Sequence, residues 1–200
     1  MKKFALILLL GVAAITQVVA AVLVDNGAPN PVAGAVASNF AGGDPEYAFQ
    51  SADDFSLTAT STITHVTWWG LYQGSNIALE PDLFTVRIFA DNAGSPSIIP
   101  FAEWRLNRVR RGATGAVSAG YDIYEYTAVL KPHITLPAGI YWLSIVNDVD
   151  TEEVGTDWLW MLSDNANGNF AARFSDETSW QPLHAFALAF QLGGMSHPTR

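Results

Sequence analysis

Apolar and polar residues alternate along most of the chain with the period of two that is typical of a half-buried β-strand. Phe84, Val86 and Ile88 fall on one face of such a run. Thr85 and Arg87 fall on its opposite face. The same pattern, rich in β-branched and aromatic residues, predicts strands near 21–25, 54–58, 63–72, 83–91, 102–110, 120–130, 133–136, 139–147, 157–163, 169–174 and 185–192.

Turn-forming residues separate these runs. Asn167-Gly168 suits a tight connection that needs positive φ, and 137–139 (Pro-Ala-Gly) is a second tight connection. Many short strands at regular spacing, with almost no helical periodicity, favour an all-β protein. We therefore expect a two-sheet antiparallel β-sandwich of jelly-roll type over 21–194, with 26–51 as a long loop and 195–200 as a flexible tail. The residues expected in its core are Phe55, Val66, Trp68, Phe84, Val86, Ile88, Tyr141, Leu143, Ile145, Phe186, Leu188 and Phe190.

The first twenty residues form a unit of their own. A short basic start, Lys2-Lys3, precedes an apolar run that ends in small residues, which is the pattern of a secretory signal peptide. We expect cleavage after Ala20, with Ala21 as the alternative. The rival interpretation is a retained membrane anchor, because 4–24 is almost continuously apolar and a span needs about 20 residues.

The lack of cysteine and the negative net charge restrict both how the fold is held together and which partners the protein can bind. The chain has no cysteine, so an ordinary core and not a disulfide framework must hold the fold. Cleavage of the signal removes Lys2 and Lys3, which leaves 8 basic residues against 19 acidic ones and a net charge of −11. A chain this acidic repels polyanions, so we expect neither nucleic acid nor an anionic membrane as a partner. Calcium, glycans and other proteins remain open.

A set of motifs occurs in order along the mature chain: VDNG at 24–27, ADDFSL at 52–57, ITHVTWWGLY at 63–72, FTVRIFAD at 84–91, ITLPAGIYWLSIVND at 134–148 and LAFQL at 188–192. This set resembles the extracellular domain of uncharacterised bacterial secreted proteins, many of which carry a PEP-CTERM sorting tail. The resemblance implies a secreted β-sandwich and brings no established activity with it. The sequence departs from the pattern after 193–194, where MSHPTR replaces a Pro-Glu-Pro motif, an apolar span and a basic end. We therefore expect free secretion, with the outer cell surface and the periplasm as alternatives.

Tryptophan provides the first candidate binding residues. Sugar-binding sandwiches stack sugars on exposed aromatic side chains, although tryptophan more often fills the space between sheets. Trp104 and Trp180 have polar neighbours in sequence, whereas Trp158 and Trp160 share a face next to an acidic loop. We therefore predict that Trp104, Trp158, Trp160 and Trp180 form the ligand-binding surface.

The densest acidic run provides the candidate metal ligands. Calcium takes six to eight oxygen ligands, which clustered carboxylates can supply. The candidates are Asp148, Asp150, Glu152 and Asp157, although their spacing fits no EF-hand and a solvated acidic loop is the simpler interpretation.

Half of the mature basic residues lie close together at Arg105, Arg108, Arg110 and Arg111. Such arginines fit an anionic polysaccharide, a charged edge strand or an internal partner for acidic groups.

No catalytic motif stands out in the sequence. The four histidines lack close metal-ligand spacing, there is no Gly-x-Ser-x-Gly motif, and no glycine-rich phosphate loop opens a helix. We therefore predict a secreted, non-catalytic binding module that recognises an extracellular glycan, with calcium as an optional cofactor. The alternatives are a structural protein of the cell surface or extracellular matrix and, less favoured, a carboxylate-dependent glycan hydrolase.

Overall fold

The computed structural model describes residues 21–39, 49–74, 82–148, 157–165, 168–176, 178–184 and 186–197. These residues form thirteen strands and no helix. The strands are β1 (Ala21–Asp25), β2 (Ala35–Ala37), β3 (Gln50–Leu57), β4 (Thr60–Gln73), β5 (Phe84–Ala90), β6 (Ala102–Leu106), β7 (Arg110–Ser118), β8 (Tyr121–Leu136), β9 (Gly139–Asn147), β10 (Asp157–Met161), β11 (Asn169–Arg173), β12 (Gln181–His184) and β13 (Phe190–His197).

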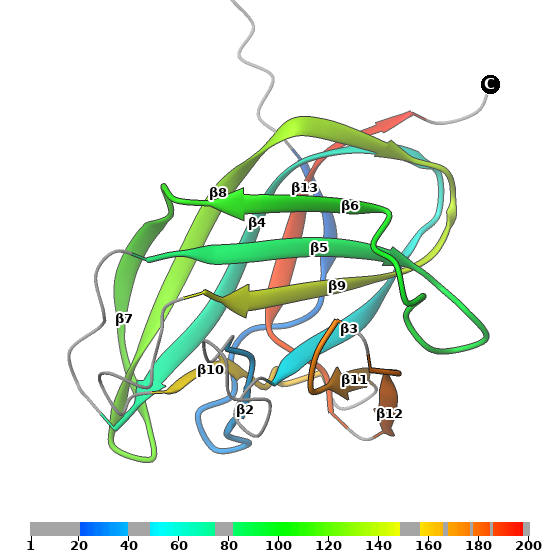
Figure 1. Ribbon diagram of the computed structural model, residues 1–200. Helices are drawn as coiled ribbons and strands as arrows, with labels where there is room; N and C mark the ends of the chain where they lie inside the picture. The colour runs from blue at the N-terminus through cyan, green and yellow to red at the C-terminus, as the bar shows by residue number, and fades with distance from the viewer. Residues whose placement is uncertain are drawn as a thin grey trace, which may run out of the picture.

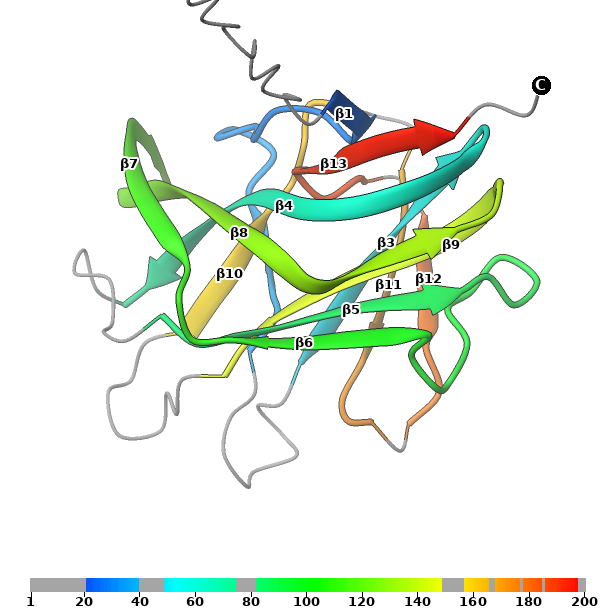
Figure 2. The ribbon, with the colours of Figure 1, turned by 90° about the horizontal axis from the view of Figure 1, so that it is seen from above.

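The strands make two antiparallel sheets that pack face to face. Within the described residues, one sheet has the order β1-β13-β4-β10-β2, with β8 also paired to β4 and β7 paired to β8. The other sheet has the order β12-β11-β3-β9-β5-β6. Figure 1 shows the second sheet in front, and Figure 2 shows the two layers from above. The predicted two-sheet antiparallel sandwich is confirmed.

The alternation of side chains builds the core between the layers. Phe84, Val86 and Ile88 of β5 are buried there, and the opposite face of the strand carries Thr85 and Arg87. The other expected core residues are also buried, with two exceptions. Tyr141 is only partly buried against the core, and Phe186, in the segment that precedes β13, is exposed.

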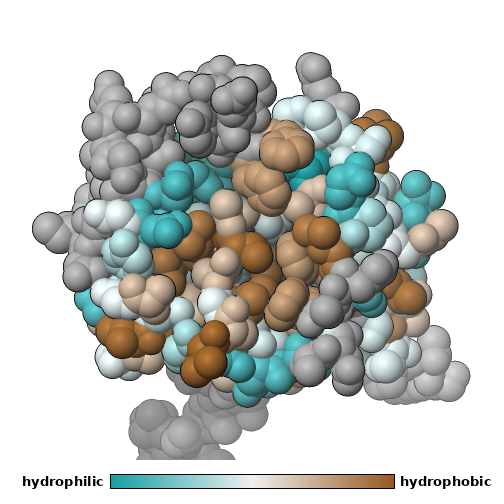
Figure 3. All heavy atoms as spheres, turned by 90° about the horizontal axis from the view of Figure 1, so that it is seen from below, coloured by the Kyte–Doolittle hydropathy of each residue, from teal (hydrophilic) through white to brown (hydrophobic). Residues whose placement is uncertain are grey.

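Apolar clusters also cover parts of both outer faces. Trp68 packs in the core, whereas its neighbour Trp69 joins a cluster with Leu71 and Met161 outside the core. A second such cluster lies on the outer face of the six-stranded sheet and consists of Ala52, Phe89, Trp142, Ala171 and Trp180. Seen from below, at a right angle to the view of Figure 1, hydrophobic residues gather near the centre of the surface, and hydrophilic residues lie among and around them (Figure 3). Both sheets therefore bury side chains on both of their faces. For this reason the alternating pattern alone does not show which residues are exposed.

Several predicted boundaries need correction. The segment 26–51 was expected to be a loop, but it contains β2 and the start of β3. The predicted strand 102–110 is divided into β6 and the start of β7, and β12 was not predicted. The expected tail from 195 is wrong at its start, because β13 pairs with β4 as far as His197. The expected signal peptide, 1–20, lies outside the described residues. No helix in the described part of the chain is long and apolar enough to cross a membrane.

Candidate functional site

The four tryptophans predicted to bind ligand are buried, and none is more than 6% exposed. Trp158 and Trp160 do share a face of β10, but that face is the core side of the sheet. Trp158 lies 5.1 Å from the ring of Phe84, and the Trp160 indole N–H donates to the Ala189 carbonyl at 3.0 Å. The prediction of an exposed platform at these two residues is wrong, because their face of β10 packs against the other sheet.

Trp104 and Trp180 are buried for two different reasons. Trp104 points into the core from β6, between its exposed neighbours, and its indole N–H donates to the Pro132 carbonyl at 2.9 Å. Trp180 packs on the outer face of the six-stranded sheet, 5.3 Å from the ring of Phe89. Polar neighbours in sequence say nothing about the side to which a strand residue points. The prediction that these two residues are exposed is therefore also wrong.

The predicted calcium ligands separate in the structure. Asp148 accepts a hydrogen bond from the Thr85 hydroxyl at 2.6 Å, next to the six-stranded sheet. Asp157 begins β10 in the other sheet and accepts from the Asn39 amide at 2.9 Å. Asp150 and Glu152 lie outside the described residues. No group of three or more His, Asp or Glu side chains within the described ranges could hold a metal ion. Calcium binding therefore stays a prediction without structural support.

A charged cluster lies on the outer face of the six-stranded sheet, the face toward the viewer in Figure 1. Four strands of this sheet and one loop contribute to it, and we call it the outer-face site. Its members are Gln50 of β3, Arg87 of β5, Glu103 of β6, Arg173 of β11 and Asp176 in the loop after β11. Strand order brings these residues together although up to 126 positions separate them in sequence.

The Asp176 carboxylate is the centre of this cluster. It accepts from both terminal nitrogens of Arg87, at 3.1 and 3.3 Å. It also accepts from Nη2 of Arg173 at 2.6 Å and from the Gln50 amide at 3.0 Å. Arg87 Nε donates in addition to Glu103 at 2.8 Å. Both acidic side chains are therefore held in fixed orientations by shared arginine donors.

Burial divides the outer-face site into a covered and an open layer. The side chains of Arg87 and Arg173 are only 10% and 1% exposed, whereas the Asp176 side chain is 55% exposed. Burial lowers the pKa of Arg173 to about 10, so the guanidinium still carries its charge at neutral pH. Partial burial raises the pKa of Glu103, but hydrogen bonds and the charges of Arg87 and Arg105 lower it overall. The buried Arg87 guanidinium thus favours the ionised form of the Glu103 carboxyl.

Two hollows flank Asp176 and share Arg87. One, of about 240 Å³, is bordered by an apolar wall from the loop between β5 and β6, in which Ile98 and Ile99 are exposed. The other, of about 280 Å³, is lined by polar and charged residues. Burial raises the pKa of Asp148 in that second hollow. Residues that line only the second hollow are Thr85, Arg105 and Asp148. The site therefore offers hydrogen-bonding groups next to an apolar surface.

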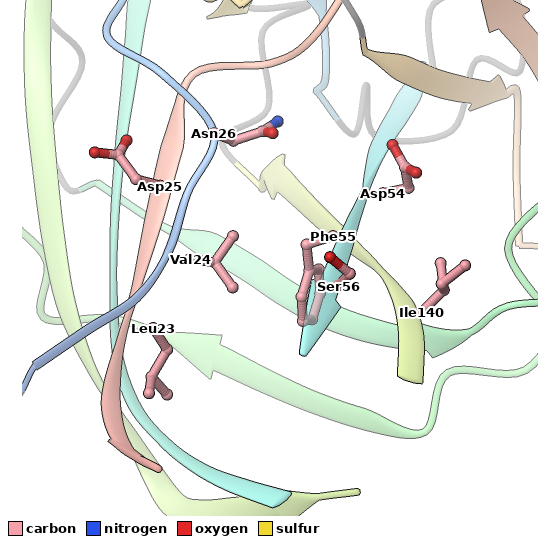
Figure 4. Close-up of a pocket in the computed structure, with 8 residues that line it drawn as sticks. All are labelled: Leu23, Val24, Asp25, Asn26, Asp54, Phe55, Ser56 and Ile140. Carbon is pink, nitrogen blue, oxygen red and sulfur yellow. The ribbon is translucent and has the colours of Figure 1, made fainter. Parts of the chain in front are cut away.

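A larger hollow, of about 500 Å³, lies between the two sheets at the side where β1 and β3 face each other (Figure 4). We call it the seam groove. Figure 4 shows the β1 residues and Asn26 on one wall and the β3 residues and Ile140 on the other. Its lining residues are Leu23, Val24, Asp25, Asn26, Asp54, Phe55, Ser56 and Ile140.

Sequence reasoning found only part of these two sites. Arg87 was correctly placed on the face opposite Phe84, and this was the one local signal for the outer-face site. Arg105 was proposed for an anionic glycan or a charged edge, and β6 is indeed the last strand of its sheet. Arg173 and Asp176 gave no signal, because their significance depends on which strands are neighbours.

Comparisons with known proteins add a family but no activity. Residues 35–193 match a family described as a domain of unknown function. No curated protein and no solved structure matches the chain.

Proposed function

The chain belongs to the DUF7901 family, whose description assigns no activity, and from this premise we propose that the domain is a secreted, non-catalytic module that binds an extracellular glycan at the outer-face site. The binding surface is not the aromatic platform expected from sequence, since the four tryptophans are buried. It is the pair of hollows that meet at Asp176.

The orientation of the Asp176 carboxylate is the observation that carries this proposal. Sugar hydroxyls bind well to carboxylates that are ionised, accessible and fixed in position, because no side-chain entropy is then lost on binding. Four hydrogen bonds from Arg87, Arg173 and Gln50 fix Asp176 in this way, and its side chain remains 55% exposed. The buried arginines hold the Asp176 carboxylate in position, and that carboxylate accepts hydrogen bonds from the glycan.

The apolar wall of the first hollow favours a sugar, and not a small ion, as the ligand. A pyranose ring has one face of C–H groups, and Ile98, Ile99 and Pro100 give such a face an exposed surface next to the carboxylates. Arg105, whose side chain is 83% exposed, adds a donor beside the second hollow. Together these groups suit a polyhydroxylated ligand that lies along the sheet across both hollows.

Titration calorimetry of glycan-array hits tests the proposal. Asp176→Asn should weaken binding by about ten-fold or more, since a hydrogen bond to a charged group contributes ~1.5–3 kcal/mol. Asp122→Asn, which changes an exposed carboxylate of β8 in the other sheet, should leave binding unchanged. A silent array, or equal affinity of Asp176→Asn and the unaltered protein, would contradict the proposal.

The same samples separate binding from hydrolysis. A glycan hydrolase needs a proton-donating acid with a raised pKa beside an ionised carboxylate. Asp148 has a raised pKa and lines the second hollow with Asp176, so it is the residue to test. We expect no release of reducing ends from a bound glycan. Release that Asp148→Asn abolishes would replace the binding module by the hydrolase alternative.

Export is part of the proposal and has its own test. We expect the mature chain to begin at Ala21, after cleavage behind Ala20, and the protein to act outside the inner membrane. N-terminal sequencing of protein recovered from the medium or the cell surface checks this. Recovery of the uncut chain from membranes would favour the retained anchor instead.

A further inference from the structure

Both walls of the seam groove are strand edges. Within the described residues, β1 pairs with β13 on one side only. β3 pairs with β9 along Ala52–Leu57, whereas its other neighbour, β11, pairs only with Gln50–Asp53. Among the residues that the structure describes, β3 therefore has no partner strand past Asp53 on the side that faces the groove. The last four residues of β3 thus form an internal edge, and β1 lies across the groove from it.

A strand edge is a binding surface because alternate residues direct their backbone N–H and C=O groups outward. The groove gives this edge side-chain contacts as well. Leu23 and Val24 line one wall, and Phe55 and Ile140 line the other (Figure 4). Ile140 is exposed, as is Val22 in the adjoining part of β1. An added strand would pair with β3 and bury every second side chain against these apolar groups.

One end of the groove is closed by an inter-sheet bridge. The Asn26 amide donates to Asp53 Oδ2 and to the Leu188 carbonyl, both at 3.0 Å. The Leu188 backbone N–H donates to the same Asp53 oxygen. This bridge ties β3 to the segment before β13 at the point where β11 stops pairing. The distance between the sheets is thus fixed at one end, and a preformed groove costs a ligand less ordering entropy.

We propose that the seam groove binds an extended basic peptide, which continues the position of β11 by pairing with the edge of β3 from Asp54 to Leu57. The charged residues that line the groove are Asp25 and Asp54, and both are acidic. A peptide with alternating apolar and basic residues matches this lining, with its apolar side chains inward and its cations beside the carboxylates.

The same charges disfavour a second copy of the chain as the occupant. A two-fold contact through the groove brings two acidic linings together, so Asp25 and Asp54 of one copy would lie near the carboxylates of the other copy. Like charges opposite each other on paired strands are destabilising. The proposal is independent of the glycan site, because the seam groove and the outer-face site share no lining residue.

Selection from a random decapeptide library, followed by amide NMR of the isotope-labelled protein, tests the proposal. Enriched peptides should alternate apolar residues with Lys or Arg, and they should shift the amides of β1 and of residues 54–57. Ile140 lies at an exposed position in the groove wall. Ile140→Lys should lower the binding affinity of these peptides by about ten-fold, because the new cation repels their basic residues. Asp54→Lys should do the same, whereas Asp122→Lys on β8 should not.

Each remaining outcome counts against the proposal. A library without enrichment, peptides that bind Ile140→Lys as well as they bind the unaltered protein, or shifts confined to the outer-face site would overturn it. A dimer that forms without peptide and protects the β1 and β3 amides from exchange would show that a second copy occupies the groove. Thermal denaturation of both groove variants separates a lost fold from a lost site, since Ile140→Lys should melt like the unaltered protein.

Discussion

The guanidinium of Arg173 lies 4.4 Å from the centre of the Trp180 ring and 5.5 Å from that of Phe89. Arg173 belongs to β11, and Trp180 follows the loop that carries Asp176. The arginine therefore fixes this loop in two ways, by stacking on the tryptophan and by donating to the Asp176 carboxylate at 2.6 Å. This relationship explains how a charged residue can be almost fully buried on the outside of a sandwich.

Replacement of this arginine should weaken both the fold and the site. Arg173→Met keeps the length of the side chain but removes every donor, and we expect a loss of about 1.5–3 kcal/mol in the free energy of unfolding. The cost stays below that of a fully buried pair because Asp176 can be hydrated. Glycan affinity should fall as well, because Asp176 loses one of its orienting partners. Urea denaturation and calorimetric titration measure the two effects.

Arg105→Met is the matched control for this variant. It removes an arginine of the same sheet face whose side chain is 83% exposed, so stability should change by no more than ~1 kcal/mol. Equal destabilisation by both variants would mean that burial and stacking of Arg173 contribute nothing.

The inter-sheet bridge should make stability depend on pH. Burial raises the pKa of the Asp53 carboxyl well above 3.8, the charge of Asp54 raises it further, and the hydrogen bonds from Leu188 and Asn26 oppose this. Because the pKa is higher in the folded than in the unfolded chain, folding is favoured when Asp53 is protonated. This contribution is complete below the unfolded pKa and is lost as the pH rises through the folded value.

Asp53→Asn removes this titration. The difference in unfolding free energy between Asp53→Asn and the unaltered protein should therefore shift in favour of the variant as the pH rises from about 4 to about 8. Urea denaturation at a series of pH values measures this difference. A difference that stays constant with pH would show that Asp53 ionises as easily in the fold as in the unfolded chain.

The contact between Gly70 and Trp158 predicts a severe effect of a single methyl group. A Cβ at Gly70 would lie 2.4 Å from the Trp158 ring, which is itself buried against Phe84. Gly70→Ala should therefore destabilise the fold by about 1–3 kcal/mol or more, because the ring has no space into which to move. Gly112→Ala in β7 is the control, since nothing lies within 4 Å of its Cβ position. Comparable melting temperatures for the two variants would contradict this account.

Local alternation predicted the strands well because it reports which residues share a face. The run 139–147 is a strand with the predicted bounds, and Trp68 lies in the core as expected. Alternation does not report whether a face is covered. Trp180 was predicted to be exposed because its neighbours are polar, but Arg173 and the sheet enclose it.

The sites depend on strand order, which the sequence does not display. Arg87 and Asp176 meet only because β5 and β11 lie in the same sheet, with β9 and β3 between them. The seam groove likewise exists because β11 stops pairing with β3 at Asp53. Neither fact follows from the composition or the spacing of a single segment.

The last prediction concerns an ion pair between Arg111 of β7 and Asp82, which lies just before β5. Arg111 Nη1 lies 2.7 Å from Asp82 Oδ2, and the Tyr72 hydroxyl donates to the other Asp82 oxygen at 3.0 Å. Burial and the charge of Asp82 raise the pKa of Tyr72, so this hydroxyl stays a donor at neutral pH. The arginine cluster seen in the sequence thus includes one residue that is an internal partner for a buried acid.

Arg111→Met should destabilise the protein by about 3–5 kcal/mol, because a buried carboxylate then loses its nearest cation. Asp82→Asn in the Arg111→Met background should recover a large part of that loss, since the amide carries no charge and can still accept from Tyr72. Urea denaturation of the two single variants and the double variant gives the coupling energy between the two residues. If the double variant is as unstable as the sum of the single variants, the charges do not interact, and the two side chains contribute only their packing.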